Sequence, residues 1–240
     1  MKARLDRLLV ERGLAPTREK AQALIMAGAV LVDGQKATKP GQQVDAASRI
    51  EVLAAPPFVS RGGLKLDAAI AHFGIRVAGR VCLDVGASTG GFTDCLLQHG
   101  AARVHAVDVG AGQLDWKIRT DARVVVHEKL NARLLRPDDI GEPIGLAVCD
   151  VSFISATLIV PAVCPLLQSD GEMVILVKPQ FEVGKGQVGK GGIVRETELH
   201  QGACRRVDEA ARALGFETSL MESPIRGGEG NREFLLYARH

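Results

Sequence analysis

Long apolar runs are missing from this sequence. The longest purely apolar stretches, such as residues 173–177, are far below the roughly 18 residues that a membrane span needs. The N-terminus is also too polar to act as a secretion signal. The sequence therefore predicts a cytoplasmic protein with no membrane partner.

Paired cysteine and histidine spacings are missing as well. The five cysteines include no C-x-x-C pair, each lies in an apolar stretch, and the six histidines show no metal-binding spacing. We therefore expect buried free thiols, with neither a disulfide framework nor a bound metal. The cysteines are Cys82, Cys95, Cys149, Cys164 and Cys204.

A strong net charge is the third absence, because the formal charge is only +2. Residues 1–60 nevertheless hold nine Lys or Arg against six Asp or Glu. The basic character therefore lies at the N-terminus.

The first 50 residues predict two helices and a hairpin. Leu5, Leu8 and Leu9 fall on one helical face, and Gly13 stands where that helix would end. Thr17 can cap a second helix that ends at Gly28 and buries three apolar residues. These three are Ala21, Leu24 and Ile25. Residues 30–32 then lead into Asp33-Gly34, which is a tight-turn signal.

Basic residues lie on the polar sides of these helices and beyond the hairpin. A surface that faces an RNA backbone is one interpretation, but charge alone favours an ordinary solvated helix face. Residues 4–35, RLDRLLVERGLAPTREKAQALIMAGAVLVDGQ, resemble an S4 RNA-binding domain, which favours RNA. The predicted RNA-binding residues of this domain are Arg4, Arg7, Arg18, Lys20 and Lys36.

Residues 54–60 predict a stiff linker, because Pro56-Pro57 fixes backbone angles and removes amide donors. We expect a small α+β domain over residues 1–53 and a second domain over residues 61–240. In the second domain, short apolar strands alternate with helical patterns, which predicts a doubly wound, Rossmann-like α/β sheet. The predicted strands are 81–85, 104–109, 124–127, 146–150 and 173–178, and a helix over 197–214 precedes an edge hairpin of 216–221 and 234–238.

A glycine-rich loop follows the first of these strands. Strand 81–85 runs into Gly86-Ala87-Ser88-Thr89-Gly90-Gly91, and a helix begins near Phe92. This is the order of a nucleotide site. Asp108 ends the next strand 22 residues after Gly86. At this spacing a carboxylate can accept hydrogen bonds from ribose hydroxyls. The alternative is a tight turn with an ordinary capping aspartate.

Ser88 helps to decide between two candidate cofactors, NAD and S-adenosylmethionine. It stands where the dinucleotide pattern G-x-G-x-x-G has the glycine that approaches pyrophosphate. S-adenosylmethionine has no pyrophosphate, so the sequence favours it over NAD. Asp84, inside the strand, can receive the methionine ammonium or a neighbouring amide, or can be purely structural.

Charged residues end two other strands. Asp150 and Lys178 stand at the carboxyl ends, beyond which ligands lie in a doubly wound sheet. Methyl transfer to a ribose hydroxyl needs a base, and a lysine partly shielded from water can be that base. Asp150 and Glu233 can orient such a lysine, and Lys65 can disfavour its charged form.

Five motifs carry a family resemblance over nearly the whole chain: SRGGLKL (60–66), GASTGGFTD (86–94), CDVSFIS (149–155), VKPQFEVGKGQVGKGG (177–192) and NREFLLY (231–237). They resemble the TlyA or hemolysin A group of FtsJ-like ribosomal RNA methyltransferases. The resemblance implies S-adenosylmethionine as cofactor and 2′-O-methylation of cytidine in ribosomal RNA. It implies a catalytic tetrad of Lys65, Asp150, Lys178 and Glu233, with Lys178 as the base. It also implies cofactor contacts from Gly86, Ser88, Thr89, Gly90, Phe92, Asp108, Gln113, Asn131 and Asp150.

Residues 184–191 nearly spell a Walker A motif, but Gly191 replaces the hydroxyl residue that holds Mg²⁺. The stretch instead predicts a basic loop that closes over RNA phosphates through Lys185 and Lys190, or else a plain surface loop.

Three other functions stay open at this point. The glycine loop alone permits a dinucleotide-dependent oxidoreductase, the family's second name suggests a membrane-active haemolysin, and an RNA-binding assembly factor needs no catalysis. The expected partner is ribosomal RNA or a ribosomal subunit, with no obligate protein partner. The chain stops soon after its last strand, whereas group members acting on both subunits look longer, so we expect the large subunit alone.

Overall fold

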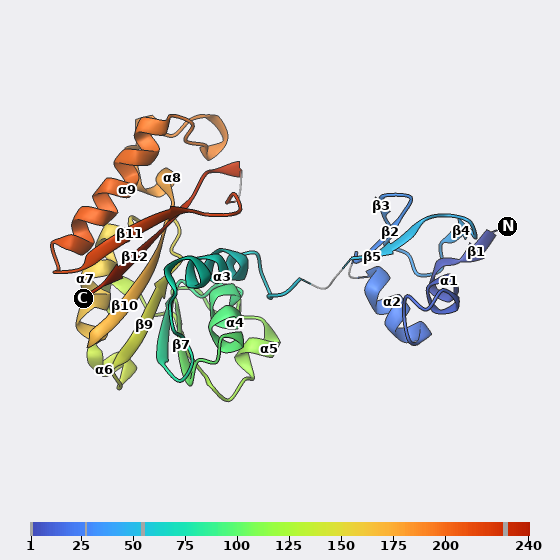
Figure 1. The fold of residues 1–240 in the computed structure, drawn as a ribbon, viewed down its shortest axis with the longest axis horizontal. Coiled ribbons are helices and arrows are strands. Elements are labelled where there is room, and N and C mark those ends of the chain that lie inside the picture. The colour runs from blue at the N-terminus through green and yellow to red at the C-terminus, as the bar shows by residue number, and fades with distance from the viewer. Residues whose placement is uncertain (1, 27, 54–55, 228–229) are drawn as a thin grey trace. The chain divides into compact units, whose positions relative to one another are not determined.

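The computed structural model describes residues 2–26, 28–53, 56–227 and 230–240, with the side chain of Lys185 also outside the description. The chain divides into two compact units, Met1–Pro56 and Pro57–His240 (Figure 1). Each unit has a hydrophobic core of its own. None of the described helices is both long and apolar enough to cross a membrane.

The smaller unit contains the two predicted helices. Helix α1 spans Leu5–Glu11 and α2 spans Arg18–Met26. Leu5 and Leu9 are fully buried, as the helical pattern predicts. Thr17 caps α2 by accepting a hydrogen bond from the Lys20 amide at 3.2 Å.

Short strands complete the smaller unit. The predicted turn is present between β2 (Val30–Val32) and β3 (Gln35–Lys36), and Asp33 and Gly34 both have positive φ angles, which this turn type requires. The sequence did not reveal β1 (Lys2–Arg4), β4 (Gln43–Asp45) and β5 (Ile50–Val52). Three residues are too few for an alternating pattern to stand out, and these strands depend on pairing of β1 with β4 and of β5 with β2.

The larger unit is built on a seven-stranded sheet in the order β11-β12-β10-β9-β6-β7-β8. The neighbours from β10 to β8 are parallel, and β12 and β11 add an antiparallel edge. This is the predicted doubly wound sheet with its edge hairpin. The strands are β6 (Val81–Val85), β7 (Arg103–Asp108), β8 (Val124–Glu128), β9 (Ile144–Cys149), β10 (Leu167–Val177), β11 (Glu217–Glu222) and β12 (Phe234–Arg239).

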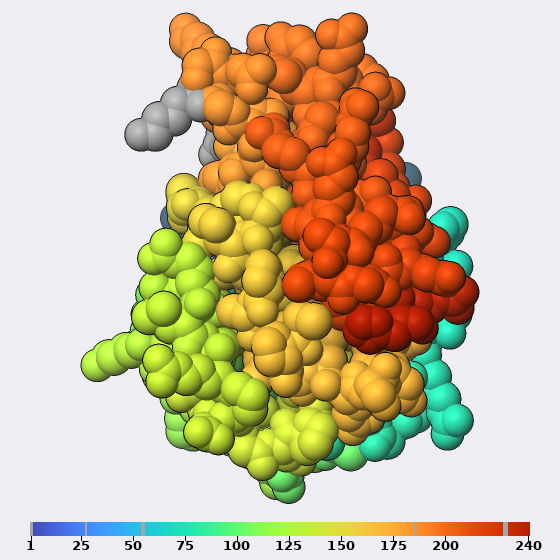
Figure 2. Space-filling view, turned by 90° about the vertical axis from the view of Figure 1, so that its left-hand side faces the viewer, coloured from blue at the N-terminus to red at the C-terminus, as the bar shows by residue number. Residues whose placement is uncertain are grey.

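Helices cover both faces of this sheet, each over its own apolar cluster. Helices α3 and α4 lie on one side, and α7 and α9 lie on the other (Figure 1). Figure 2 views the unit from the side of α9 (orange) and α7 (yellow). The helices are α3 (Gly62–Phe73), α4 (Gly91–Gln98), α5 (Trp116–Arg119), α6 (Pro137–Ile140), α7 (Val160–Val163), α8 (Pro179–Glu182) and α9 (Thr197–Arg212).

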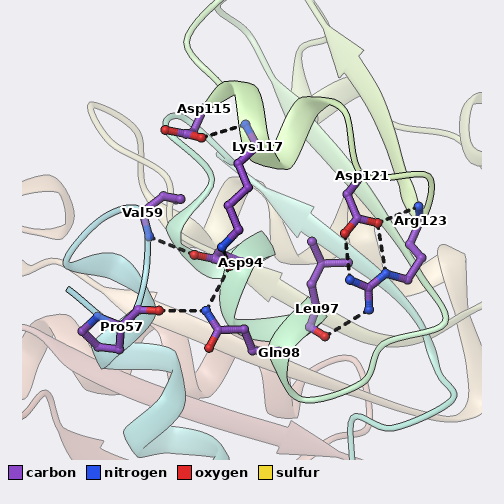
Figure 3. Close-up of polar contacts among 9 residues, drawn as sticks. All are labelled: Pro57, Val59, Asp94, Leu97, Gln98, Asp115, Lys117, Asp121 and Arg123. Carbon is purple, nitrogen blue, oxygen red and sulfur yellow. Dashed lines mark hydrogen bonds and ion pairs between the residues drawn. The ribbon is translucent and has the colours of Figure 1, made fainter. Parts of the chain in front are cut away.

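The stretch 54–60 is only partly described, because residues 54 and 55 lie outside the described residues. The residues from Pro57 onward belong to the larger unit. Gln98 of α4 donates a hydrogen bond to the Pro57 carbonyl at 2.8 Å, and the Val59 amide donates to Asp94 at 2.9 Å (Figure 3). Lys117 pairs with Asp94 at 3.4 Å. The chain therefore enters α3 along a path held by α4.

The cysteines have free thiols, as predicted. Four of them are buried and Cys164 is half-buried. Burial raises the pKa of the Cys82 thiol to about 12, so the protonated thiol packs as a small apolar group.

Candidate active site

The glycine loop links β6 to α4 at the carboxyl edge of the sheet. Gly86 has a φ of 86°, and a Cβ at this position would lie 2.5 Å from the carbonyl oxygen of Asp150. Gly90 has a φ of 96° and caps the N-terminus of α4. At position 86, only glycine can combine a positive φ with such a close approach to the Asp150 carbonyl. The loop backbone is therefore accessible to a ligand.

Asp108 fixes the shape of this loop from the end of β7. Its carboxylate accepts hydrogen bonds from the Ser88 amide at 2.8 Å and from the Gly110 amide at 2.7 Å. The Ser88 hydroxyl donates to the Gln113 carboxamide at 3.3 Å. Asp108 thus joins two strand-end loops, and its remaining lone pairs are available to ligand hydroxyls.

A cavity of about 600 Å³ opens beyond these loops. Its volume is in the range of small-molecule sites, and its wall includes apolar residues such as Val107, Leu130 and Ile159. The predicted cofactor residues that line it are Gly86, Ser88, Asp108, Gln113, Asn131 and Asp150. Thr89 and Phe92 line a neighbouring cavity instead. Gly90 lies under the loop, where a Cβ would meet Leu114 at 2.8 Å.

Asp84 is fully buried and belongs to neither of these two linings. It accepts a hydrogen bond from the Thr93 hydroxyl at 2.6 Å, which ties β6 to α4. Burial raises the pKa of this carboxyl to about 7. Of the roles that the sequence left open for Asp84, the structure supports the structural one.

The neighbouring cavity has a volume of about 290 Å³ and carries the charged residues. Lys65, Asp150 and Lys178 line it, and it shares Gly86, Ser88, Asp150 and Ser152 with the larger cavity. Asp150 therefore stands where the two cavities adjoin. A donor molecule in one and an acceptor in the other would meet at this residue.

Two lysine–carboxylate pairs lie at the smaller cavity. Lys178 forms an ion pair with Asp150 at 2.5 Å and donates a hydrogen bond to the Ser152 hydroxyl at 2.9 Å. Lys65 pairs with Glu233 at 2.5 Å, and both are buried. The attraction within each pair offsets part of the free-energy cost of removing these charges from water. Lys65 of α3, Asp150 directly after β9 and Lys178 directly after β10 thus line one cavity, and Glu233, directly before β12, joins them through its pair with Lys65.

The carboxylate of Glu233 packs against Gly227 on its way to Lys65. A Cβ at position 227 would lie 2.0 Å from a carboxylate oxygen of Glu233. A glycine at this position leaves the carboxylate room to reach the lysine.

Comparison with known proteins identifies the family of each unit. A family model described as FtsJ-like methyltransferase matches residues 58–240. The chain belongs to the FtsJ-like methyltransferase family. An S4 domain model matches residues 3–50. Membership in a methyltransferase family weighs against the oxidoreductase alternative, which rested on the glycine loop alone.

Named relatives cover most of this FtsJ-like chain. It is 48% identical to the 16S/23S rRNA (cytidine-2′-O)-methyltransferase TlyA of Mycobacterium tuberculosis, over 99% of this chain and 90% of that one. It is 36% identical to the 23S rRNA (cytidine-2′-O)-methyltransferase TlyA of Campylobacter jejuni, over 75% and 70%. A solved structure of a candidate hemolysin from Streptococcus thermophilus matches with a TM-score of 0.76 and 45% identity, over 99% and 88%.

Phe153 is a site residue of this FtsJ-like domain that the sequence did not reveal. It follows Asp150 closely, lines the larger cavity and is 92% exposed. Its φ of 65° is rare for a bulky residue. Its ring lies 5.2 Å from that of Phe181, which in turn faces the Lys178 amine. An exposed aromatic held in a strained backbone is a candidate ligand contact, and only its place in the CDVSFIS motif could have marked it.

The predicted RNA-binding residues fall into different environments. Arg7, Lys20, Lys36 and Lys190 are exposed, and the side chain of Lys185 lies outside the described part of the chain. Arg4 and Arg18 both bind Asp6. Arg12, directly after α1, donates hydrogen bonds to the carbonyls of Ala46 and Ser48, so it ties the end of this helix to the loop between β4 and β5.

A group of three residues from α3 and the C-terminal half of α4 could hold a metal ion. The sequence pattern did not predict this group, because its members are brought together only by the packing of the two helices. Asp67, Cys95 and His99 offer ligand atoms within 4.8 Å of one another. His99 and Asp67 already pair at 2.7 Å, and burial raises the pKa of the Cys95 thiol well above its usual range. The contact links the two helices, and the cluster is not part of either cavity lining.

Proposed function

We propose that this protein transfers a methyl group from S-adenosylmethionine to a ribose 2′-hydroxyl, that of cytidine, in large-subunit ribosomal RNA. The observation that carries the proposal is the position of Asp150 and Lys178. Asp150 lines both the cavity of about 600 Å³ and the smaller, charged cavity, and Lys178 in the smaller cavity pairs with it.

The larger cavity fits the cofactor by its chemistry. Asp108 offers a carboxylate to ribose hydroxyls, Gly86 exposes backbone, and Val107 and Ile159 offer apolar walls to an adenine ring. Gly86, Ser88, Asp108, Gln113 and Asn131 would hold the cofactor. When bound, it supplies an electrophilic methyl group on a sulfonium.

The smaller cavity would hold the target ribose. As general base, Lys178 Nζ acts as a neutral amine: it takes the proton from the 2′-hydroxyl and becomes an ammonium, which the Asp150 carboxylate stabilises. Ser152 holds the amine in place through its hydrogen bond. Lys65, fixed by Glu233, directs a positive charge at the oxygen on which negative charge develops.

Two further features support an RNA substrate. The match to the S4 domain model covers residues 3–50, and this stretch carries five candidate phosphate contacts. Phe153 offers an exposed ring at the rim of the larger cavity, where a base taken out of its stack can pack. Lys190 adds a positive charge on the loop that follows α8.

The choice of RNA rests on the relatives. The Mycobacterium tuberculosis and Campylobacter jejuni proteins are named for different sets of subunits, and 23S RNA is common to both names. We therefore propose large-subunit RNA as the target. A ribosomal RNA substrate would place the protein in the cytoplasm.

Lys178→Ala tests the proposal. The variant should lose methyl transfer by about 1,000-fold, because the substitution removes the proposed proton acceptor. Calorimetric titration should find its affinity for S-adenosylmethionine unchanged and no heat with NAD for either protein. Mapping of ribose methylation in ribosomal RNA from cells with and without the gene identifies the nucleotide. Full activity of the variant would remove Lys178 as the base.

A further inference from the structure

Asp6 is the only buried charged residue among the described residues of the smaller unit. It lies in the first turn of α1, and its side chain is fully buried. A carboxylate costs several kcal/mol to bury, and an apolar residue of similar size often serves a core equally well. The contacts of this carboxylate therefore need an explanation.

Three side chains converge on Asp6. Arg4 donates two hydrogen bonds in fork geometry, from Nε at 3.1 Å and from Nη2 at 2.9 Å. Arg18 Nε donates at 2.9 Å and Gln22 Nε2 at 3.1 Å, both to Oδ2, the oxygen that also accepts from Arg4 Nη2. The two guanidinium groups are therefore neighbours, held at a shared atom.

The arginines face outward from this buried anchor. The side chains of Arg4 and Arg18 are 38% and 45% exposed, so each remains open to solvent over part of its surface. Two cations on one carboxylate leave a local charge of +1, with N–H donors directed to the surface.

The carboxylate stays charged at all working pH values. The hydrogen bonds from Arg4, with smaller contributions from Gln22 and Arg18, hold the pKa of Asp6 well below its usual range. Its partners are thus fixed by charge-assisted hydrogen bonds, which are stronger than neutral ones.

We propose that Asp6 is a positioning residue for RNA binding, whose carboxylate holds the guanidinium groups of Arg4 and Arg18 together as a preformed phosphate-binding pair. This inference rests on the proposed function only in that the S4 unit binds RNA. Free arginine side chains lose rotamer freedom when they bind a phosphate. Arginines already held by Asp6 lose less, and the N–H groups on Nη1 and Nη2 that Asp6 does not occupy can bind phosphate oxygens.

Asp6→Asn separates this role from simple charge neutralisation. The control is Glu11→Gln, which makes the same change in net charge at an exposed position of α1. Both variants of the full chain are titrated with purified large ribosomal subunits at several salt concentrations. We expect Asp6→Asn to weaken binding by about tenfold although it adds positive charge, while Glu11→Gln leaves binding equal or slightly tighter. Tighter binding by Asp6→Asn would overturn the proposal.

The salt dependence gives a second readout. Asp6→Asn keeps both arginines, so the slope of log K against log salt should stay as in the unchanged protein. Arg18→Ala removes one phosphate contact and should reduce that slope by about one. At saturating RNA, turnover should be unaltered and only KM should rise. If Asp6→Asn is fully folded by circular dichroism and binds RNA as tightly as the unchanged protein, Asp6 has no role in RNA binding and the proposal is wrong.

Arg18→Lys keeps the test decisive if Asp6→Asn does not fold. Residue 18 is half exposed, so the substitution threatens the fold little, and it preserves the charge while removing the Nε donor that Asp6 holds. We expect it to bind nearly as weakly as Arg18→Ala. Binding equal to that of the unchanged protein would mean that charge alone matters. Neither result bears on methyl transfer, which Lys178→Ala tests separately.

Discussion

Each unit of this protein buries an aspartate completely, and the two behave in opposite ways. Asp84 of the larger unit has the Thr93 hydroxyl as its hydrogen-bond partner, and burial raises its pKa to about 7. Asp6 of the smaller unit binds two arginines and an amide, which lower its pKa. Burial alone therefore does not decide whether a carboxyl carries charge. The partners that the fold brings to it decide.

The two units also direct their paired charges differently. In the smaller unit, a buried anion holds cations that face solvent, which suits recognition of a polyanion. In the larger unit, Lys65 and Lys178 face a cavity, and carboxylates hold them there. Substitutions in the first unit should change affinity for RNA, and substitutions in the second should change turnover.

The double variant Lys65→Met/Glu233→Gln tests the second half of this contrast and should have the largest effect. Removing both partners leaves no unpaired buried charge, so the fold should survive. Turnover should fall by about 100-fold, because the developing oxyanion loses a nearby cation. The measurement is single-turnover methylation at saturating RNA. A change confined to the KM for RNA would show that the pair acts in recognition, as in the smaller unit.

The contrast between the buried aspartates predicts opposite pH dependences. The pKa of Asp84 is raised in the folded protein, so its contribution to stability is present below about pH 4 and is lost as pH rises through about 7. The lowered pKa of Asp6 means that its contribution is present above about pH 4 and is lost at lower pH.

Asp84→Asn measures the first of these effects. From pH 5 to pH 8, its free energy of unfolding relative to the unchanged protein should improve by about 2 kcal/mol, because the amide has no proton to lose. Urea unfolding at both pH values gives the difference, with Cys82→Ser as a control in the same strand. A difference that does not vary with pH would show that Asp84 ionises normally.

Phe153→Ala should have the smallest effect of this set. Loss of a stacking surface for one base is worth about 1–3 kcal/mol, so kcat/KM should fall by roughly tenfold. Phe153→Tyr keeps the ring and should act like the unchanged protein. Calorimetry should find cofactor binding intact, and equal activity of the alanine variant would leave the exposed ring without a role in the reaction.

Local patterns predicted most of the larger unit. The strand, glycine loop and helix around Gly86 are visible in sequence because glycine spacing and apolar runs are properties of neighbouring residues. The short strands β1, β4 and β5 were missed, since each is stabilised by a distant partner. Phe153 was missed for a related reason, because its positive φ and its exposure appear only in the folded chain.

The prediction of a catalytic tetrad came from resemblance rather than from spacing. Lys65 and Glu233 are 168 residues apart, and nothing local connects them. The same holds for Asp6, whose neighbour Arg4 is close in sequence but whose partner Arg18 comes from another helix. Charges at a distance along the chain become partners only when the elements that carry them pack.

The order of the elements, the turn at Asp33-Gly34 and the open backbone of the glycine loop follow from the sequence itself, because side-chain periodicity and backbone sterics act over a few residues. Tertiary structure alone decided which carboxylates meet which cations, and so which are charged. The reason is that electrostatic and desolvation energies depend on distance and burial in space, and those exist only once the sheet and its helices have come together.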